Sequence, residues 1–156
     1  MNLQLFFRSV FFSVVFLSSG SASAKDPMGT VKLTSAHDVA GTIDKLVTVL
    51  ESKGMKIFAR IDHAEGATNA GLELRPTQLL IFGNPKVGTP LMQCSQSIAL
   101  DLPQKMLAWE AEDGKVYLAY NQPAYLKVRH NTEGCDEVLA KVSGALKKFA
   151  EAATSE

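Results

Sequence analysis

Asp62 and His63 are adjacent, and a carboxylate beside an imidazole is a pair that general base catalysis uses. Adjacent residues of a strand point to opposite faces of a sheet, however, which weakens a direct contact between the two side chains. The chain also lacks the G-x-S-x-G motif that would supply an activated serine. Asp62 with Glu65 instead resembles a helix-capping pair, and we favour that structural interpretation. We predict no catalytic residue.

Imidazole, thiol and thioether groups are ligands that copper and zinc accept. The side chains that would have to converge on such an ion are His37, His63, His130, Met92, Cys94 and Cys135. No two histidines have the i, i+4 spacing that places two imidazoles on one helix face. Methionine and cysteine more often fill a core. The pattern therefore predicts no metal site and no cofactor.

The two cysteines, Cys94 and Cys135, match neither a zinc motif nor a CxxC redox motif. An exported protein can keep a disulfide, and a closed loop of about 40 residues would add roughly 4 kcal/mol of stability in the chain-entropy model. We predict that the two cysteines are joined. Inert buried thiols and a redox-active pair are the alternatives.

The best candidate for a binding element is a loop predicted at residues 83–88. It contains Asn84 and Lys86, and loops held by a rigid scaffold often carry binding residues. Lys86 could meet an anion, with Arg75 or Tyr120 beside it. The opposing interpretation is turn chemistry, because glycine, asparagine and proline are what a sharp turn requires. Asp62 and His63 are further candidates for ligand-binding residues.

The N-terminus has the pattern of a cleavable secretory signal. Arg8 precedes an apolar run at residues 10–17, and Ala22-Ser23-Ala24 is an A-x-A cleavage site before Lys25. A membrane span needs about 20 apolar residues, and this run is shorter. The pattern predicts a periplasmic or secreted protein with no stable membrane insertion after cleavage.

Cleavage would divide the chain into a signal peptide (1–24), a flexible N-terminus (25–30) and one domain (31–152). The whole chain has 16 basic and 16 acidic residues, so removal of Arg8 leaves 15 basic and 16 acidic residues. This balance lacks the basic face that nucleic-acid binding requires.

Two helices are predicted from apolar residues that recur at helical spacing. The first carries Ile43, Leu46, Val47 and Leu50, with Ser35 as its N-cap and Gly54 as its stop. The second carries Val138, Leu139, Val142, Leu146 and Phe149 on one face. Shorter helices are expected after Asp62, from Thr89 with Pro90 at its first position, and over residues 123–130.

Strands are predicted at residues 31–35, 56–62, 77–82, 105–111 and 115–120. The run 77–82 is the most apolar after the signal, which predicts a central strand buried on both faces. Glu112-Asp113-Gly114 predicts a hairpin between the last two strands. The order is β-α-β-β-β-β-α, which indicates an α+β fold with an antiparallel sheet covered by helices on one face.

The chain resembles the bacterial domain-of-unknown-function family 302 from about residue 31 to residue 150. The phrase FGNPK at 82–86, followed by GTPLM at 88–92, is the most specific part of the resemblance. The other stretches that follow the family pattern are 62–63, 74–81, 101–103, 109–110, 113–115 and 120–126. The resemblance implies a TATA-binding-protein-like arrangement of a sheet and two helices. It implies no DNA binding, because a fold does not carry a function with it.

Three hypotheses for the function follow. The first is a binding module that holds a small apolar or anionic ligand between the sheet and its helices. The second is a protein that assembles as a homodimer through the sheet. The third, which we place last, is a thiol- or metal-dependent redox protein, because no nucleotide, metal or nucleophile motif supports an enzyme.

Overall fold

Five strands form an antiparallel sheet in the computed structural model, which describes residues 29–156. The predicted signal peptide and residues 25–28 of the predicted flexible N-terminus lie outside the described residues. The strands lie in the order β1-β5-β4-β3-β2. Their bounds are β1 (Thr30–Thr34), β2 (Lys56–Asp62), β3 (Thr77–Gly83), β4 (Gln104–Glu110) and β5 (Val116–Asn121). The predicted α+β class and its antiparallel sheet are confirmed.

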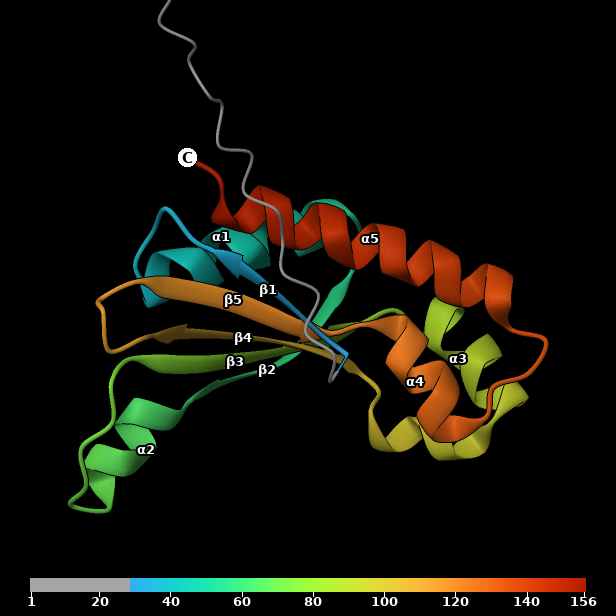
Figure 1. Ribbon diagram of the computed structural model, residues 1–156, viewed down its shortest axis with the longest axis horizontal. Helices are drawn as coiled ribbons and strands as arrows, with labels where there is room; N and C mark the ends of the chain where they lie inside the picture. Colours follow the sequence, from blue (N-terminus) through green and yellow to red (C-terminus); the bar gives the residue numbers. More distant parts are fainter. Residues whose placement is uncertain (1–28) are drawn as a thin grey trace, which may run out of the picture.

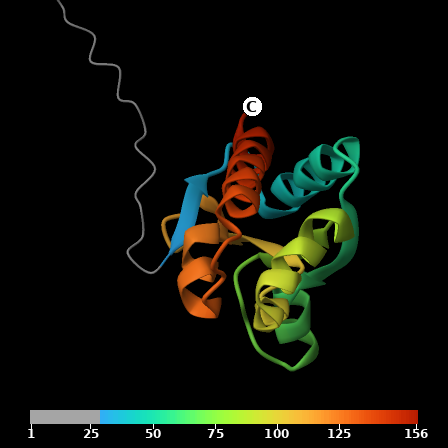
Figure 2. The ribbon, with the colours of Figure 1, turned by 90° about the vertical axis from the view of Figure 1, so that its right-hand side faces the viewer.

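Two long helices, α1 (Val39–Ser52) and α5 (Asp136–Thr154), lie side by side across one face of the sheet (Figure 1, Figure 2). The shorter helices are α2 (His63–Asn69), α3 (Pro85–Cys94), the 3₁₀ helix η1 (Gln96–Leu100) and α4 (Pro123–His130). In Figure 1, α3 and α4 gather at one end of the sheet, and α2 extends from the opposite end. No helix among the described residues has the length and apolar character needed to cross a membrane.

The core lies between the sheet and the pair α1 and α5. The predicted stripe of α1 is confirmed, because Ile43, Leu46 and Leu50 are fully buried. They pack with Leu146 and Phe149 of α5 and with the helix-facing side chains of the sheet. Complete burial of one such side chain contributes about 1.5–3 kcal/mol relative to its exposure. The two helices therefore depend on the same sheet for their stability.

The sheet buries only one of its faces, so the prediction that β3 is buried on both faces is wrong. Leu80 and Phe82 are fully buried against the helices, whereas Leu79 and Ile81 on the other face are only half-buried. An antiparallel sheet can leave one face to solvent even when that face carries aliphatic residues. The apolar run alone does not distinguish the two situations.

Two predicted helix starts are also corrected. Asp38, rather than Ser35, caps α1, because its Oδ1 accepts the backbone N–H of Gly41 at 2.7 Å. Helix α3 begins at Pro85 rather than at Pro90, because Asn84 is itself a good N-cap and its Oδ1 accepts the N–H of Lys86 at 2.9 Å. The expected loop at residues 83–88 is therefore mostly the first turn of α3.

Other local predictions are confirmed. Asp62 caps α2 by accepting the backbone N–H of Glu65 at 3.0 Å. The hairpin joins β4 to β5, with Gly114 at a positive φ of 76°. Asp113 Oδ1 accepts the N–H of Lys115 within that turn. These contacts span only a few residues, which is why the sequence could indicate them.

Candidate functional site

A groove of about 410 Å³ lies between α3, α5 and the ends of β2, β3 and β4. Its lining is almost wholly apolar. The aliphatic, aromatic and thioether side chains that line it are Met55, Phe58, Val87, Leu91, Met92, Leu102, Val142, Leu146 and Phe149. Leu91 and Leu146 are buried, whereas Phe58 is 46% exposed and Val87 39% exposed at its mouth. The groove therefore reaches from the core to the surface.

Local irregularities in the strands help to form this groove. The register of β2 against β3 shifts between Ile57 and Ala59, so Phe58 is the extra residue of a β-bulge. A bulge bends a strand and redirects a side chain, and Phe58 contributes to the groove lining. Gly83 ends β3 beside it, where an added Cβ would lie 3.4 Å from Pro103 and 3.5 Å from the Phe58 ring.

One polar side chain stands out within the apolar lining. Gln104, the first residue of β4, lines the groove and is only 8% exposed. It lies on the same face of β4 as Met106, so its side chain extends toward the helices. Within residues 29–156, no hydrogen bond joins its side-chain amide to another protein group. Among the described residues, Thr132 Oγ1 is the one fully buried side-chain polar atom without a partner, so the Gln104 amide keeps access to solvent through the groove. A ligand group that paired with this amide would gain about 0.5–1.5 kcal/mol, the net value of a neutral hydrogen bond.

The one charged side chain that lines the groove, Lys141, is paired with a carboxylate. Lys141 lines the groove from α5, and its Nζ lies 2.6 Å from Glu137 Oε1. This contact lowers the pKa of Glu137, mainly through the hydrogen bond that Lys141 donates. Both side chains are well exposed, so the pair adds little stability. Lys141 is the one charged side chain that lines the groove, so the lining itself carries no unpaired charge.

The predicted disulfide between Cys94 and Cys135 is present, with a Cα–Cα distance of 6.4 Å. Cys94 is the last residue of α3, and Cys135 is the N-cap of α5. The disulfide therefore ties together two helices that both line the groove.

The structure brings together only some of the predicted ligand-binding residues. Asn84 lines the groove, and Lys86 lies on the first turn of α3 beside it. Asp62 and His63 lie at the other end of the β2–β3 pair, because Lys56 faces Gly83 in the register whereas Asp62 faces Gln78.

Arg75 and Tyr120 do not flank Lys86 as expected. Arg75 precedes β3, and its Nε donates to the Glu110 carbonyl at 3.3 Å. Tyr120 is buried in the core, where desolvation raises the pKa of its phenol. The pKa of Asp62 is lowered, chiefly because its carboxylate accepts the N–H of Glu65.

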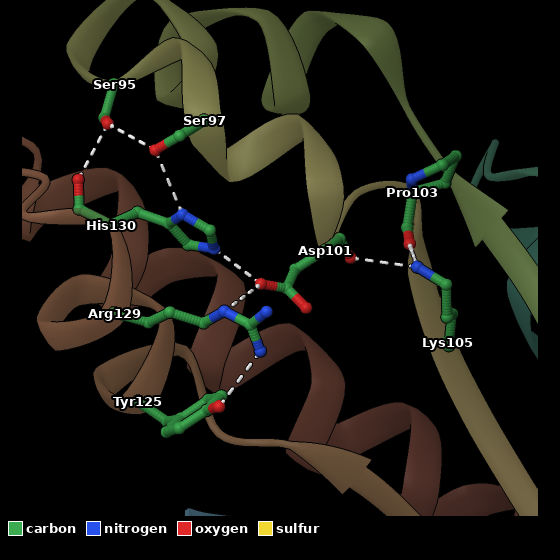
Figure 3. A network of polar contacts seen from close by, with 8 residues as sticks. All are labelled: Ser95, Ser97, Asp101, Pro103, Lys105, Tyr125, Arg129 and His130. Carbon is green, nitrogen blue, oxygen red and sulfur yellow. Dashed lines mark hydrogen bonds and ion pairs between the residues drawn. The ribbon is translucent and has the colours of Figure 1, made fainter.

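A second polar cluster lies between η1 and α4 (Figure 3), and its residues Ser97, Asp101 and His130 are not among those that line the groove. His130 is buried, with its Nε2 2.5 Å from Asp101 Oδ2 and its Nδ1 3.1 Å from Ser97 Oγ. Arg129 Nε lies 3.3 Å from the same Asp101 oxygen. From the sequence, His130 is only a metal-ligand candidate, and neither Ser97 nor Asp101 is predicted as a site residue. No three His, Cys, Asp or Glu side chains in the described part of the chain form a group that could hold a metal ion.

Comparison with known proteins identifies relatives over most of the chain. The family described as "Domain of unknown function DUF302" matches residues 31–149. A protein named "Fluoride-specific ion channel FluC 1" from Brucella suis biovar 1 is 46% identical over 126 residues, which cover 78% of this chain and 50% of that protein. "Fluoride-specific ion channel FluC 2" from Brucella melitensis biotype 1 is also 46% identical, over 78% of this chain and 47% of that protein. The chain thus spans about half the length of the curated relatives it matches.

A solved structure supports the fold. The crystal structure of an uncharacterised conserved DUF302 protein from Bacillus stearothermophilus has a TM-score of 0.73 to this chain at 18% identity. The similarity covers 81% of this chain and 98% of that one. At this level of identity, the comparison shows that the fold is shared and carries no conclusion about activity.

Proposed function

The chain belongs to the DUF302 family, and from that premise we propose that it is a binding module for a small amphiphilic ligand held in the groove between α3 and α5. The ligand has an apolar body and one neutral hydrogen-bonding group, such as an amide, an ester carbonyl or a hydroxyl. The observation that carries this proposal is the side chain of Gln104, whose amide has no protein partner among the described residues and faces a mostly apolar groove.

The apolar lining accounts for the affinity. Burial of about 200 Å² of apolar ligand surface is worth roughly 5 kcal/mol before the entropic cost of binding. Met55 and Met92 line the groove, and unbranched thioether side chains adapt to ligands of irregular shape. Binding sites of this kind combine an apolar surface with a few polar groups that fix the ligand's orientation.

Gln104 accounts for the selectivity. An amide can donate and accept hydrogen bonds, so it can pair with a neutral carbonyl, amide or hydroxyl group. A carboxylate would need a cation at the same depth, and the cation of Lys141 is already paired with Glu137 at the rim. Burial of an unpaired charge costs more than burial of a neutral polar group. A neutral head group is therefore favoured.

Fluorescence of N-phenyl-1-naphthylamine tests the site. We expect the protein to bind this probe, and Ala145→Trp to abolish binding because Ala145 lines the groove. Ala140→Trp is the matched control, since Ala140 is exposed on the same helix and lies outside the lining. Equal binding by the two variants, or no binding by the wild type, would contradict the proposal.

Displacement of the probe tests the role of Gln104. Dodecanamide should displace the probe more strongly than dodecanoate does. Gln104→Met, which keeps the side-chain length, should weaken dodecanamide binding about 2–10-fold, because one neutral hydrogen bond contributes about 0.5–1.5 kcal/mol. It should leave the affinity for the probe unchanged. An unaltered affinity for dodecanamide in this variant would remove Gln104 from the site.

A second candidate function is that of an accessory domain for a membrane ion channel. The observation that favours it is that a segment 46% identical to this chain makes up about half of proteins named fluoride-specific ion channels. Two domains joined in one chain often act on the same process. We would measure growth in fluoride of a strain that lacks this protein, with and without the gene restored. Identical growth of the two strains, with no channel co-purified from cross-linked membranes, would count against this function.

A further inference from the structure

Ser97, His130 and Asp101 form a continuous chain of hydrogen bonds between η1 and α4 (Figure 3). The hydroxyl Oγ lies 3.1 Å from Nδ1 of the imidazole, and Nε2 lies 2.5 Å from the carboxylate. A hydroxyl, a base and a carboxylate that orients the base, in this order, is the arrangement that activates a serine for acyl transfer. Such a constellation is recognised by its geometry rather than by its position in a sequence.

The Asp101 carboxylate determines the tautomer of the imidazole. An ionised carboxylate only accepts hydrogen bonds, so Nε2 must carry the proton that it donates to Asp101. Nδ1 of the neutral ring then has its lone pair toward Ser97, and the serine hydroxyl donates to it. The His130 side chain is 3% exposed, and Arg129 contacts Asp101 from the solvent side, so the ring and the carboxylate are held in place.

The exposure of the three residues differs in the way that a reactive serine requires. Ser97 is exposed, whereas the His130 side chain is buried and that of Asp101 is 14% exposed. A second serine, Ser95, already joins the two elements, because its Oγ donates to the His130 carbonyl at 2.7 Å. Two large apolar side chains next to the cluster in sequence, Leu100 and Val128, are 76% and 83% exposed.

We propose that Ser97 is the nucleophile of an acyl-transfer site that hydrolyses small esters, with His130 as its general base and Asp101 as a positioning residue. Ser97 Oγ forms a bond to the ester carbonyl carbon, and His130 Nδ1 takes the serine proton. The carbonyl–alkoxy bond then breaks, and His130 returns the proton to the leaving alcohol. Water hydrolyses the acyl-serine by the same proton transfers in reverse, which releases the acid and regenerates the serine.

This site is separate from the amphiphile groove, because none of its three residues lines that groove. The two proposals therefore fail independently. Loss of probe binding in Ala145→Trp bears only on the groove, and the reactivity of Ser97 bears only on the cluster.

A fluorophosphonate probe tests the nucleophile in the purified full chain. Peptide mass spectrometry should locate the adduct on Ser97, with a rate at least about 100-fold above that of the urea-unfolded protein, since general base catalysis contributes about 10²–10⁴-fold. Ser97→Ala should abolish both the adduct and the hydrolysis of p-nitrophenyl butyrate. Ser52→Ala, at an exposed serine of α1, should change neither. A folded wild type without an adduct on Ser97 would overturn the proposal.

Asp101→Asn separates positioning from folding, because it keeps the side-chain shape. The amide can donate to Nε2 and stabilise the wrong tautomer, so labelling of Ser97 should fall by at least about 100-fold. Raising the pH should not restore the rate, because the neutral ring then carries its proton on Nδ1, the nitrogen that must accept the proton of Ser97. Circular dichroism confirms that the variant is folded. A labelling rate equal to that of the wild type would show that the cluster is only structural.

Discussion

Removal of the disulfide between Cys94 and Cys135 should destabilise the protein by about 4 kcal/mol. The bond closes a loop with a sequence separation of 41 residues. In the chain-entropy model, a cross-link that closes a loop of this length lowers the conformational entropy of the unfolded ensemble by roughly 13 cal/mol/K. At 25 °C this corresponds to about 4 kcal/mol of stability. For a domain of this size, the melting temperature should fall by roughly 10–20 °C.

Urea unfolding of the oxidised protein, the reduced protein and the Cys94→Ala/Cys135→Ala variant measures this effect. The reduced protein and the variant should have similar midpoints, both below that of the oxidised protein. Reductant should leave the variant unchanged, which makes the variant the control for other effects of the reagent. The m-value should rise on reduction, because the unfolded chain without the cross-link exposes more surface. A loss of less than 1 kcal/mol, or an equal effect of reductant on the variant, would refute the reasoning.

Four further predictions concern single positions. Asp38→Ala should cost about 1 kcal/mol in urea unfolding because α1 loses its cap, whereas Asp38→Asn should cost little. Thr132→Val should stabilise the protein by about 1 kcal/mol, since the buried Thr132 hydroxyl has no hydrogen-bond partner among the described residues; a loss of stability would contradict this. The folded-state pKa of Asp62 lies below its ordinary value of 3.8, so the stability of the wild type over Asp62→Asn should be complete at neutral pH and shrink as the pH falls below 3.8. N-terminal sequencing of the exported protein should begin at Lys25, and intact Met1 in the membrane fraction would contradict cleavage.

The sequence determined the features that depend on contacts between near neighbours. The stripe of Ile43, Leu46 and Leu50 recurs at helical spacing, so α1 follows from the period of the pattern. The Asp62 cap and the turn at Gly114 each join groups within a few residues of one another. Where two local solutions compete, sequence reasoning fails. Asn84 with Pro85 and Thr89 with Pro90 both fit a helix start, and the structure uses the first pair.

Only the tertiary structure decided which residues could form a site. The groove needs α3, α5 and the bulge at Phe58 to meet, and nothing in the residues near Gln104 indicates that its amide lacks a partner. Ser97 and His130 are 33 residues apart in sequence. Their contact depends on how η1 and α4 pack at the end of the sheet. The cysteines show the same limit, because the sequence suggested that they pair but not that their bond would join two helices that both line a groove. Local periodicity fixes secondary structure, whereas a site arises from packing between segments far apart in the chain, which no local pattern encodes.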